Sequence, residues 1–215
     1  MTLKTEPYLL QRERLPPGSG SCIIAQYDDE WVVVYQAYKP SIAAWATQNG
    51  RLGGDDFSFN RMSWIKPNFL WMMFRSGWAT KKDQESILAI RIARKNFECL
   101  LREAVHSSFI PAIYGDQETW KRALASSEVR LQWDPDHDPF GHPTERRAIQ
   151  VGLKGSLLRS FATDWIVDVQ DITPFVASQK KLLVSGQLPA LQVPVEAVYP
   201  MQDQELRRAI GINYP

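Results

Sequence analysis

The chain of 215 residues suits one large domain or at most two small ones. It is long enough to bury roughly 70% of its unfolded surface, so its core needs no disulfide or structural metal. The formal net charge of +1 gives no indication of a global attraction to nucleic acid or membranes, so any anion site must come from local clustering. The two cysteines, Cys22 and Cys99, match no metal-binding spacing and are expected to be reduced thiols.

Residues 1–20 predict an N-terminal arm that ends at the turn-forming run of residues 16–20. The arm lacks an apolar core segment and carries acidic residues, unlike a signal or transit peptide, so a cytoplasmic protein is expected. Residues 22–27 and 31–38 then predict a β-hairpin. Residues 41–49 predict a helix that begins after Pro40 and is closed by Gly50.

We expect the fold to be organised around the stretch of residues 57–78. Residues 69–74 are six consecutive apolar residues, far fewer than the about 20 that span a bilayer. A segment that is apolar on every side is buried on every side, which predicts a buried helix. Pro67 is expected to open this helix and Gly77 to end it.

No acidic residue lies between Asp56 and Asp83, so the cations in this stretch, Arg61, Lys66, Arg75, Lys81 and Lys82, have no local partner. Arg61, Lys66 and Arg75 are the three that lie around Trp64 and Trp71. An unpaired charge next to a core is costly, so these cations need either acidic side chains from elsewhere in the fold or an anionic ligand. Both alternatives stay open, and the acids considered for such pairs are Asp28, Glu30 and Glu98.

The rest of the chain predicts strands over residues 86–93, 129–134, 146–153 and 165–172, and helices over 95–106, 117–126, 155–163 and 173–185. His106 is expected to cap the helix that ends there. Residues 186–215 form a proline-rich tail that is expected to wrap the surface. No repeat or linker is evident, so we predict a single α+β domain over residues 21–215, with a mixed, mostly antiparallel sheet and helices packed around it.

One loop carries the acidic skeleton of a calcium site. Asp134, Asp136 and Asp138 alternate, and Glu145 follows at position twelve. Pro139 stands where the sharp turn of such a loop requires glycine, and the flanking segments predict strands rather than helices. These departures disfavour a calcium site and favour ordinary turn chemistry. No metal is therefore predicted.

Other catalytic motifs are missing. No G-x-S-x-G elbow is present, and neither cysteine has a histidine beside it. His137 and His142 lack a third zinc ligand nearby. The glycine-rich run of residues 50–56 contains no Walker lysine, and it is interpreted as a flexible loop.

The basic and aromatic residues around Trp64 favour a ligand that carries both phosphate and a ring. Arginine binds phosphate through two hydrogen bonds, and indole stacks on bases. A nucleotide, a dinucleotide such as NAD, or RNA would use both features. The residues expected to bind it are Arg61, Trp64, Lys66 and Arg75, with Arg147 from a later strand, and Asp134 or Glu145 would act as general base or cation stabiliser.

Several runs of the chain resemble an uncharacterised family catalogued as domain of unknown function 4291. They are YQAYKPSIAAWATQNGRL, FSFNRMSWIKPNFLWMMFRSGWATK, LQWDP and RRAIQVGL. The resemblance extends over nearly all of the chain after about residue 20. It implies a single-domain member of that family but carries no activity.

The run VVVYQAYKPSIAAWATQNGRL is also similar to the opening of ADP-ribosyltransferase-type domains. In those domains a strand ends in a tyrosine-histidine-glycine-threonine-like tetrad, which a helix follows. The similarity implies that residues 35–38 occupy the tetrad and that Ser63 stands near the serine of the second motif. Gln36 then replaces the histidine or arginine that grips the nicotinamide-side ribose, and Tyr38 ends the tetrad.

These observations support two hypotheses. The first is an enzyme of the transferase type that binds a nucleotide or NAD-like ligand, with no membrane partner. The second is a non-catalytic module for RNA or single-stranded nucleic acid, whose binding would weaken steeply with salt. The candidate catalytic residues are Gln36, Asp134 and Glu145, and the candidate binding residues are Tyr38, Arg61, Ser63, Trp64, Lys66, Arg75 and Arg147.

Overall fold

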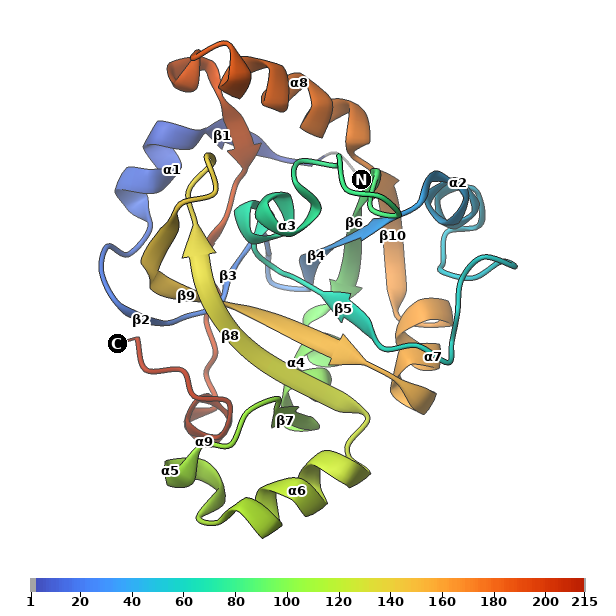
Figure 1. Cartoon of the computed structure of the whole chain (residues 1–215), viewed down its shortest axis with the longest axis vertical. Coiled ribbons are helices and arrows are strands. Elements are labelled where there is room, and N and C mark those ends of the chain that lie inside the picture. Colours follow the sequence, from blue (N-terminus) through green and yellow to red (C-terminus); the bar gives the residue numbers. More distant parts are fainter. Residues whose placement is uncertain (1–2, 215) are drawn as a thin grey trace.

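Two principal β-sheets with helices packed around them form the α+β fold of the computed structural model, which describes residues 3–214 (Figure 1). The first sheet is antiparallel, in the order β10–β6–β4. Its strands are β4 (Trp31–Tyr38), β6 (Ser86–Ala93) and β10 (Ile166–Asp171). The predicted fold class, with mixed, mostly antiparallel strands, is confirmed.

The first sheet is covered on both faces, which explains the long apolar runs in β4 and β6, whereas β10 at its edge carries polar residues. Side chains of α2 (Pro40–Asn49), α4 (Arg94–Arg102) and α7 (Gly155–Thr163) share a core with Val32 and Val34. Side chains from the opposite face of β4 pack with α3 (Phe69–Ser76) and α8 (Thr173–Val184). Each face of the sheet therefore has a separate hydrophobic core.

The second sheet is built on a long hairpin. Strands β8 (Val129–His137) and β9 (Pro143–Leu153) pair antiparallel, and β5 (Ser63–Ile65) pairs antiparallel with β9. The edge strands β2 (Gly20–Ser21) and β7 (Ala104–His106) are parallel to β9 and β8. Leu131, Ile149 and Val151 face the core, so Gln132 and Gln150 face the other side by alternation.

A pair of backbone hydrogen bonds joins the two sheets. The amide of Tyr35 donates to the carbonyl of Lys66 at 2.7 Å, and the amide of Lys66 donates back at 3.1 Å. Tyr35 lies in β4 and Lys66 directly follows β5. The junction therefore fixes the backbone of Lys66 between the sheets.

The helix predicted around residues 69–74 is α3. The side chain of Asn68 accepts a hydrogen bond from the amide of Trp71 at 2.7 Å, and Gly77 ends the helix with φ of 61°. The expectation of burial on every side is wrong, because Phe74 is 39% exposed and Arg75 is exposed too. One edge of α3 faces solvent.

Strands from the N-terminal and C-terminal segments of the chain pair with each other. Residues predicted as an arm form β1 (Thr5–Pro7) and α1 (Tyr8–Arg14), and β1 pairs with β11 (Gln192–Pro194) of the tail. Strand β3 (Ile24–Ala25) pairs with β12 (Ala197–Val198). The predicted hairpin is therefore reduced to a Tyr27–Val32 bridge, because non-local partners take both of its strands.

The helix predicted over residues 95–106 is shorter than expected and ends at Arg102. His106 belongs to β7 and caps nothing. Its Nδ1 atom lies 3.0 Å from the Tyr114 hydroxyl, and its Nε2 atom lies 3.1 Å from the carbonyl of Ile210. The remaining short helices are α5 (Pro111–Tyr114), α6 (Gln117–Ser126), η1 (Leu188–Ala190) and α9 (Gln204–Ala209).

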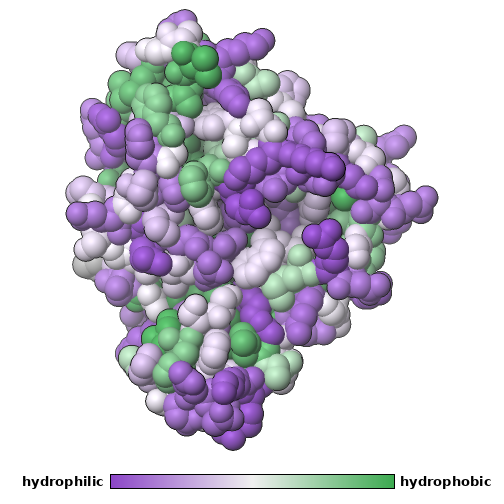
Figure 2. All heavy atoms as spheres, viewed as in Figure 1, coloured by the Kyte–Doolittle hydropathy of each residue, from purple (hydrophilic) through white to green (hydrophobic). Residues whose placement is uncertain are grey.

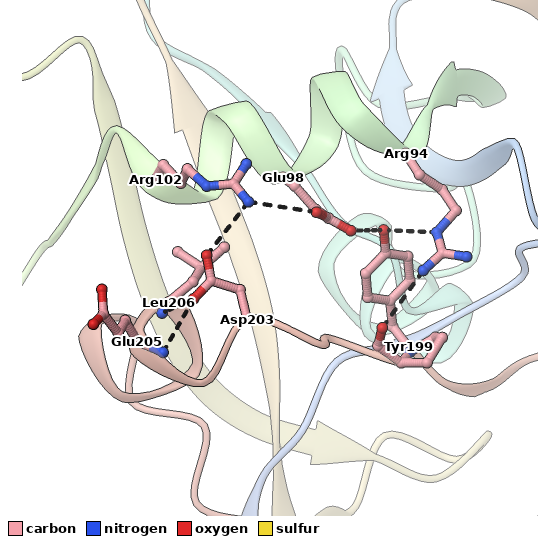
Figure 3. A network of polar contacts seen from close by, with 8 residues as sticks. Arg94, Glu98, Arg102, Tyr199, Asp203, Glu205 and Leu206 are labelled. Atoms are coloured by element: carbon pink, nitrogen blue, oxygen red, sulfur yellow. Dashed lines mark hydrogen bonds and ion pairs between the residues drawn. The ribbon is translucent and has the colours of Figure 1, made fainter.

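A polar network ties α4 to the tail (Figure 3). The Tyr199 hydroxyl donates to Glu98 at 2.9 Å and accepts from Arg94 at 3.0 Å. Arg102 lies 3.7 Å from Glu98 and 3.4 Å from Asp203, whose carboxylate also caps α9. The charge of Glu98 is thus used to hold the C-terminal segment.

A buried carboxyl at the start of α3 makes stability depend on pH. Glu196 is 1% exposed and accepts a hydrogen bond from the amide of Phe69 at 2.8 Å. Burial raises the pKa of Glu196 well above its ordinary value. The folded carboxyl therefore keeps its proton at a pH where the unfolded one has lost it.

We expect Glu196→Gln to flatten this pH dependence. The contribution of Glu196 is fully present below its unfolded pKa of about 4.3 and is lost as pH rises toward the folded pKa, at about 1.4 kcal/mol per pH unit. The glutamine is neutral throughout, and its carbonyl still accepts from Phe69. Urea unfolding of both proteins from pH 5 to 8 measures the difference in slope, and equal slopes would contradict the assignment.

Candidate functional site

A cleft of about 730 Å³ opens where the two sheets meet. It is lined by the end of β4, by β5 and α3, and by the cleft-facing side of β8 and β9. Figure 2 shows hydrophilic residues gathered across the middle of this face, where Figure 1 places α3, β4 and β5. The volume lies in the range of small-molecule sites, which is about 300–1,000 Å³.

The three cations singled out in the sequence, Arg61, Lys66 and Arg75, all line this cleft. Within residues 3–214, no carboxylate lies within 4 Å of any of them. Two of the proposed partners are used elsewhere: Asp28 accepts from two backbone amides of its own turn, and Glu98 contacts Tyr199 and Arg102. The third, Glu30, forms no ion pair with these cations among the described residues. Internal ion pairing is therefore not what balances this cluster.

Lys66 is the most buried of these cations, at 3% exposed. Loss of hydration and the nearby charge of Arg75 lower the pKa of Lys66 to about 7, although the charge of Asp134 acts in the opposite direction. Burial disfavours the charged form of an amine, and a second cation adds to that effect. Near neutral pH, the amine of Lys66 is thus present in both protonated and neutral forms.

Gln36, Tyr38 and Ser63 form a closed ring of hydrogen bonds. The amide of Gln36 donates to the Ser63 hydroxyl at 2.7 Å, and the Tyr38 hydroxyl donates to the Gln36 carbonyl at 2.8 Å. The Ser63 and Tyr38 oxygens lie 2.8 Å apart, so Ser63 donates to Tyr38 and completes the ring. Burial raises the pKa of Tyr38, which keeps its hydroxyl protonated.

Trp64 provides an aromatic surface in the cleft. Its backbone pairs with Gly152 of β9. A Cβ atom at position 152 would lie 2.9 Å from the Trp64 ring and 2.7 Å from the Met62 sulfur. Glycine at position 152 therefore lets the indole lie directly against the strand, and Trp64 lines the cleft.

Two glutamines that sequence reasoning missed also line the cleft. Gln132 and Gln150 are register partners on β8 and β9, and each donates to one oxygen of Asp134 at 2.7 Å. Asp134 itself does not line the cleft, but its charge acts on Lys66. The alternation of Gln132 and Asp134 in β8 is visible in the sequence and indicates that both side chains lie on one face. Their link to Gln150 becomes clear only once β8 is paired with β9.

A family model described as Domain of unknown function (DUF4291) matches residues 22–199. The chain belongs to the DUF4291 family. The match includes all the residues that line the cleft, from Gln36 to Gln150. No curated protein matches the chain. Over the described part of this DUF4291 protein, no helix has the length and apolar character to cross a membrane.

Besides Asp134, two further predicted residues lie outside the cleft of this DUF4291 chain. Arg147 is an odd number of positions from Gln150, so it points to the opposite face of β9, where it is exposed and donates to the carbonyl of Trp133 at 2.7 Å. Glu145 lies five positions from Gln150, about 17 Å along a strand, and lines a separate cleft beside α1. Neither joins the cluster.

The acidic skeleton considered for calcium is dispersed along β8 and the turn after it. Asp136 is buried and paired with Arg146 at 2.5 Å, whereas Asp134 is held by glutamines. Among residues 3–214, no group of three or more His, Cys, Asp or Glu side chains is arranged to hold a metal ion. The strand geometry separates side chains that a calcium loop would bring together.

Proposed function

We propose that the cleft of this DUF4291 protein binds a phosphate-bearing nucleotide or NAD-like ligand and that the protein is a transferase of the ADP-ribosyl type. One observation carries the proposal: Arg61, Lys66 and Arg75 converge on a single cleft without any carboxylate in ion-pair distance among the described residues. The charge of the buried Lys66, with Arg75 nearby, is costly without an anion. The phosphates of the ligand supply that anion.

The binding roles follow from side-chain chemistry. Arg61 and Arg75 offer the forked geometry that matches phosphate oxygens, and Lys66 adds a point charge deeper in the cleft. Trp64 offers a ring face on which a base or nicotinamide stacks, an interaction worth about 1–3 kcal/mol. Phosphate and ring are therefore both recognised.

The ring of Gln36, Tyr38 and Ser63 is proposed to hold a ribose. By the resemblance to ADP-ribosyltransferase-type domains, Gln36 would stand where a histidine or arginine grips the nicotinamide-side ribose, and Ser63 near the serine of the second motif. The hydrogen bonds that join these two residues to Tyr38 support such a role. Release of nicotinamide leaves positive charge on the ribose. Asp134, which is held by Gln132 and Gln150 and whose charge acts on Lys66, is the carboxylate proposed to stabilise that charge.

Thermal unfolding with NAD⁺, ATP, GTP and a short single-stranded RNA, each alone, tests the proposal. A ligand at 100 times its Kd adds about 2.7 kcal/mol, which raises the Tm by roughly 5–10 °C at this length. We expect NAD⁺ or one nucleotide to raise the Tm at both low and high salt. A shift with RNA alone that disappears at high salt would favour the nucleic-acid module, and no shift at all would overturn both.

A further inference from the structure

The amine of Lys66 is held in the cleft without a hydrogen-bond partner or counter-ion in the described residues. Its backbone is fixed by the two hydrogen bonds to Tyr35 that join the sheets. Lys66 is 3% exposed, and its side chain lines the cleft. The small accessible part of the residue therefore faces the cleft. This position is unusual for a lysine that only contributes charge.

The charges around Lys66 favour its neutral form. Arg75 on α3 is permanently charged and repels a second cation, whereas Asp134 on β8 is engaged by two glutamine amides. A lysine is activated as a nucleophile by loss of hydration and by a neighbouring cation, and both are present here. The other ionisable side chains that line the cleft are Tyr38, Lys39, Asp56, Arg61, Lys82 and Asp83.

We propose that Nζ of Lys66 is a nucleophile that forms an imine with the carbonyl carbon of a phosphate-bearing aldehyde or ketone. Arg61 and Arg75 bind the phosphate of this ligand, and Trp64 packs against its body. The inference uses the same cleft as the proposed function but requires neither NAD⁺ nor a nucleotide.

The step is a condensation that needs no oxidant or reductant. The lone pair of the neutral amine attacks the carbonyl carbon, which forms the N–C bond and gives a carbinolamine. The carbonyl oxygen then leaves as water with both hydrogens of the amine, and a C=N bond remains. The Tyr38 and Ser63 hydroxyls line the same cleft and can pass protons during water loss.

Two other lysines in the cleft serve as internal controls. Lys39 is ion-paired with Asp56 at 2.5 Å, and Lys82 is exposed to solvent. Both share the phosphate-attracting field of the cleft, but neither is buried. Reaction that depended only on that field would modify all three lysines.

Pyridoxal 5′-phosphate is a suitable probe because it combines an aldehyde, a ring and a phosphate. The protein is incubated with the probe, borohydride reduces the imine to a stable amine, and peptide mass spectrometry locates the label. We expect the label on Lys66, about ten-fold slower labelling by pyridoxal without the phosphate, and competition by inorganic pyrophosphate. The rate at Lys66 should rise with pH through a midpoint near 7.

Variants separate this inference from a general reactivity of surface lysines. Lys66→Arg should abolish the label, whereas Lys39→Arg and Lys82→Arg should keep it. A label on Lys39 or Lys82 in place of Lys66 would overturn the inference, and the mapping on wild-type protein decides this even where a variant does not fold. A Tm shift with NAD⁺ but no label on Lys66 would support the proposed function and reject Lys66 as a nucleophile. A label on Lys66 without a Tm shift from NAD⁺ or a nucleotide would support the nucleophile and reject the proposed function.

Discussion

Replacing both Arg61 and Arg75 with alanine should abolish binding of anionic ligands in the cleft while leaving the fold intact. Each arginine that bonds a phosphate through charged hydrogen bonds contributes about 1.5–3 kcal/mol, so each single variant should weaken the Kd about 10- to 100-fold. Titration calorimetry with NAD⁺ or inorganic pyrophosphate measures the loss.

The fold should tolerate these changes because neither arginine makes a side-chain hydrogen bond or ion pair within residues 3–214, and both are exposed. Surface changes of this kind alter stability by about 0.5 kcal/mol or less. Arg147→Ala is the matched control, since Arg147 is exposed on the opposite face of β9. If Arg75→Ala unfolds the protein, the cluster supports the fold rather than a ligand.

The predicted elements that hold in the structure are those specified by local chemistry. The helix α6 has the predicted bounds, residues 117–126, with Asp116 as its N-cap. The helix α2 begins at Pro40 and ends before Gly50, whose φ of 66° few other residues adopt. Both signals are contained within a dozen residues, so no tertiary information is needed to interpret them.

The elements that were missed depend on partners far away in the chain. The strand β1 forms because residues 192–194 pair with it. The sequence of residues 1–20 alone does not predict that pairing. His106 follows apolar residues at helical spacing, yet its strand is formed by pairing with β8. Tertiary pairing overrides local propensity in both segments.

Some residues of the candidate site could be predicted from their proximity in the chain, whereas others depend on how distant strands pair. Arg61, Ser63, Trp64 and Lys66 lie within six positions on β5 and its flanks, so proximity in the chain already predicts proximity in space. The error at Arg147 comes from strand parity, because an odd offset from Gln150 turns its side chain to the other face. Glu145 lies beyond it on β9, where the pairing with β8 is irregular, and it lines the separate cleft beside α1. Gln132 and Gln150 meet only through the register of β8 and β9.

Both sheets contribute to the cleft through the Tyr35–Lys66 junction. β4 supplies Gln36 and Tyr38 directly after Tyr35, and β5 supplies Ser63 and Trp64 directly before Lys66. The junction therefore holds the residues proposed to bind ribose and phosphate at a fixed spacing. A site placed between two rigid sheets is better preorganised than one carried by loops.

The largest effect on stability is expected from breaking the ion pair between Asp136 and Arg146. Asp136 is 1% exposed and accepts from Nε of Arg146 at 2.9 Å and from Nη2 at 2.5 Å. Arg146 also donates to the carbonyl of Pro16 at 2.9 Å, which fastens the N-terminal segment to β9. Arg146→Met leaves a buried carboxylate without its counter-charge, a change that costs about 3–5 kcal/mol.

The double variant Asp136→Asn with Arg146→Met should recover much of this loss. The asparagine carbonyl can still accept the hydrogen bond that the His137 amide now donates to Asp136 at 2.8 Å, and no charge remains buried. Urea unfolding of the wild type, both variants and Arg147→Met measures the free energies, with the last expected within about 0.5 kcal/mol of the wild type. Equal losses in the single and double variants would mean that the contact with Pro16, rather than the charge pair, stabilises this end of β9.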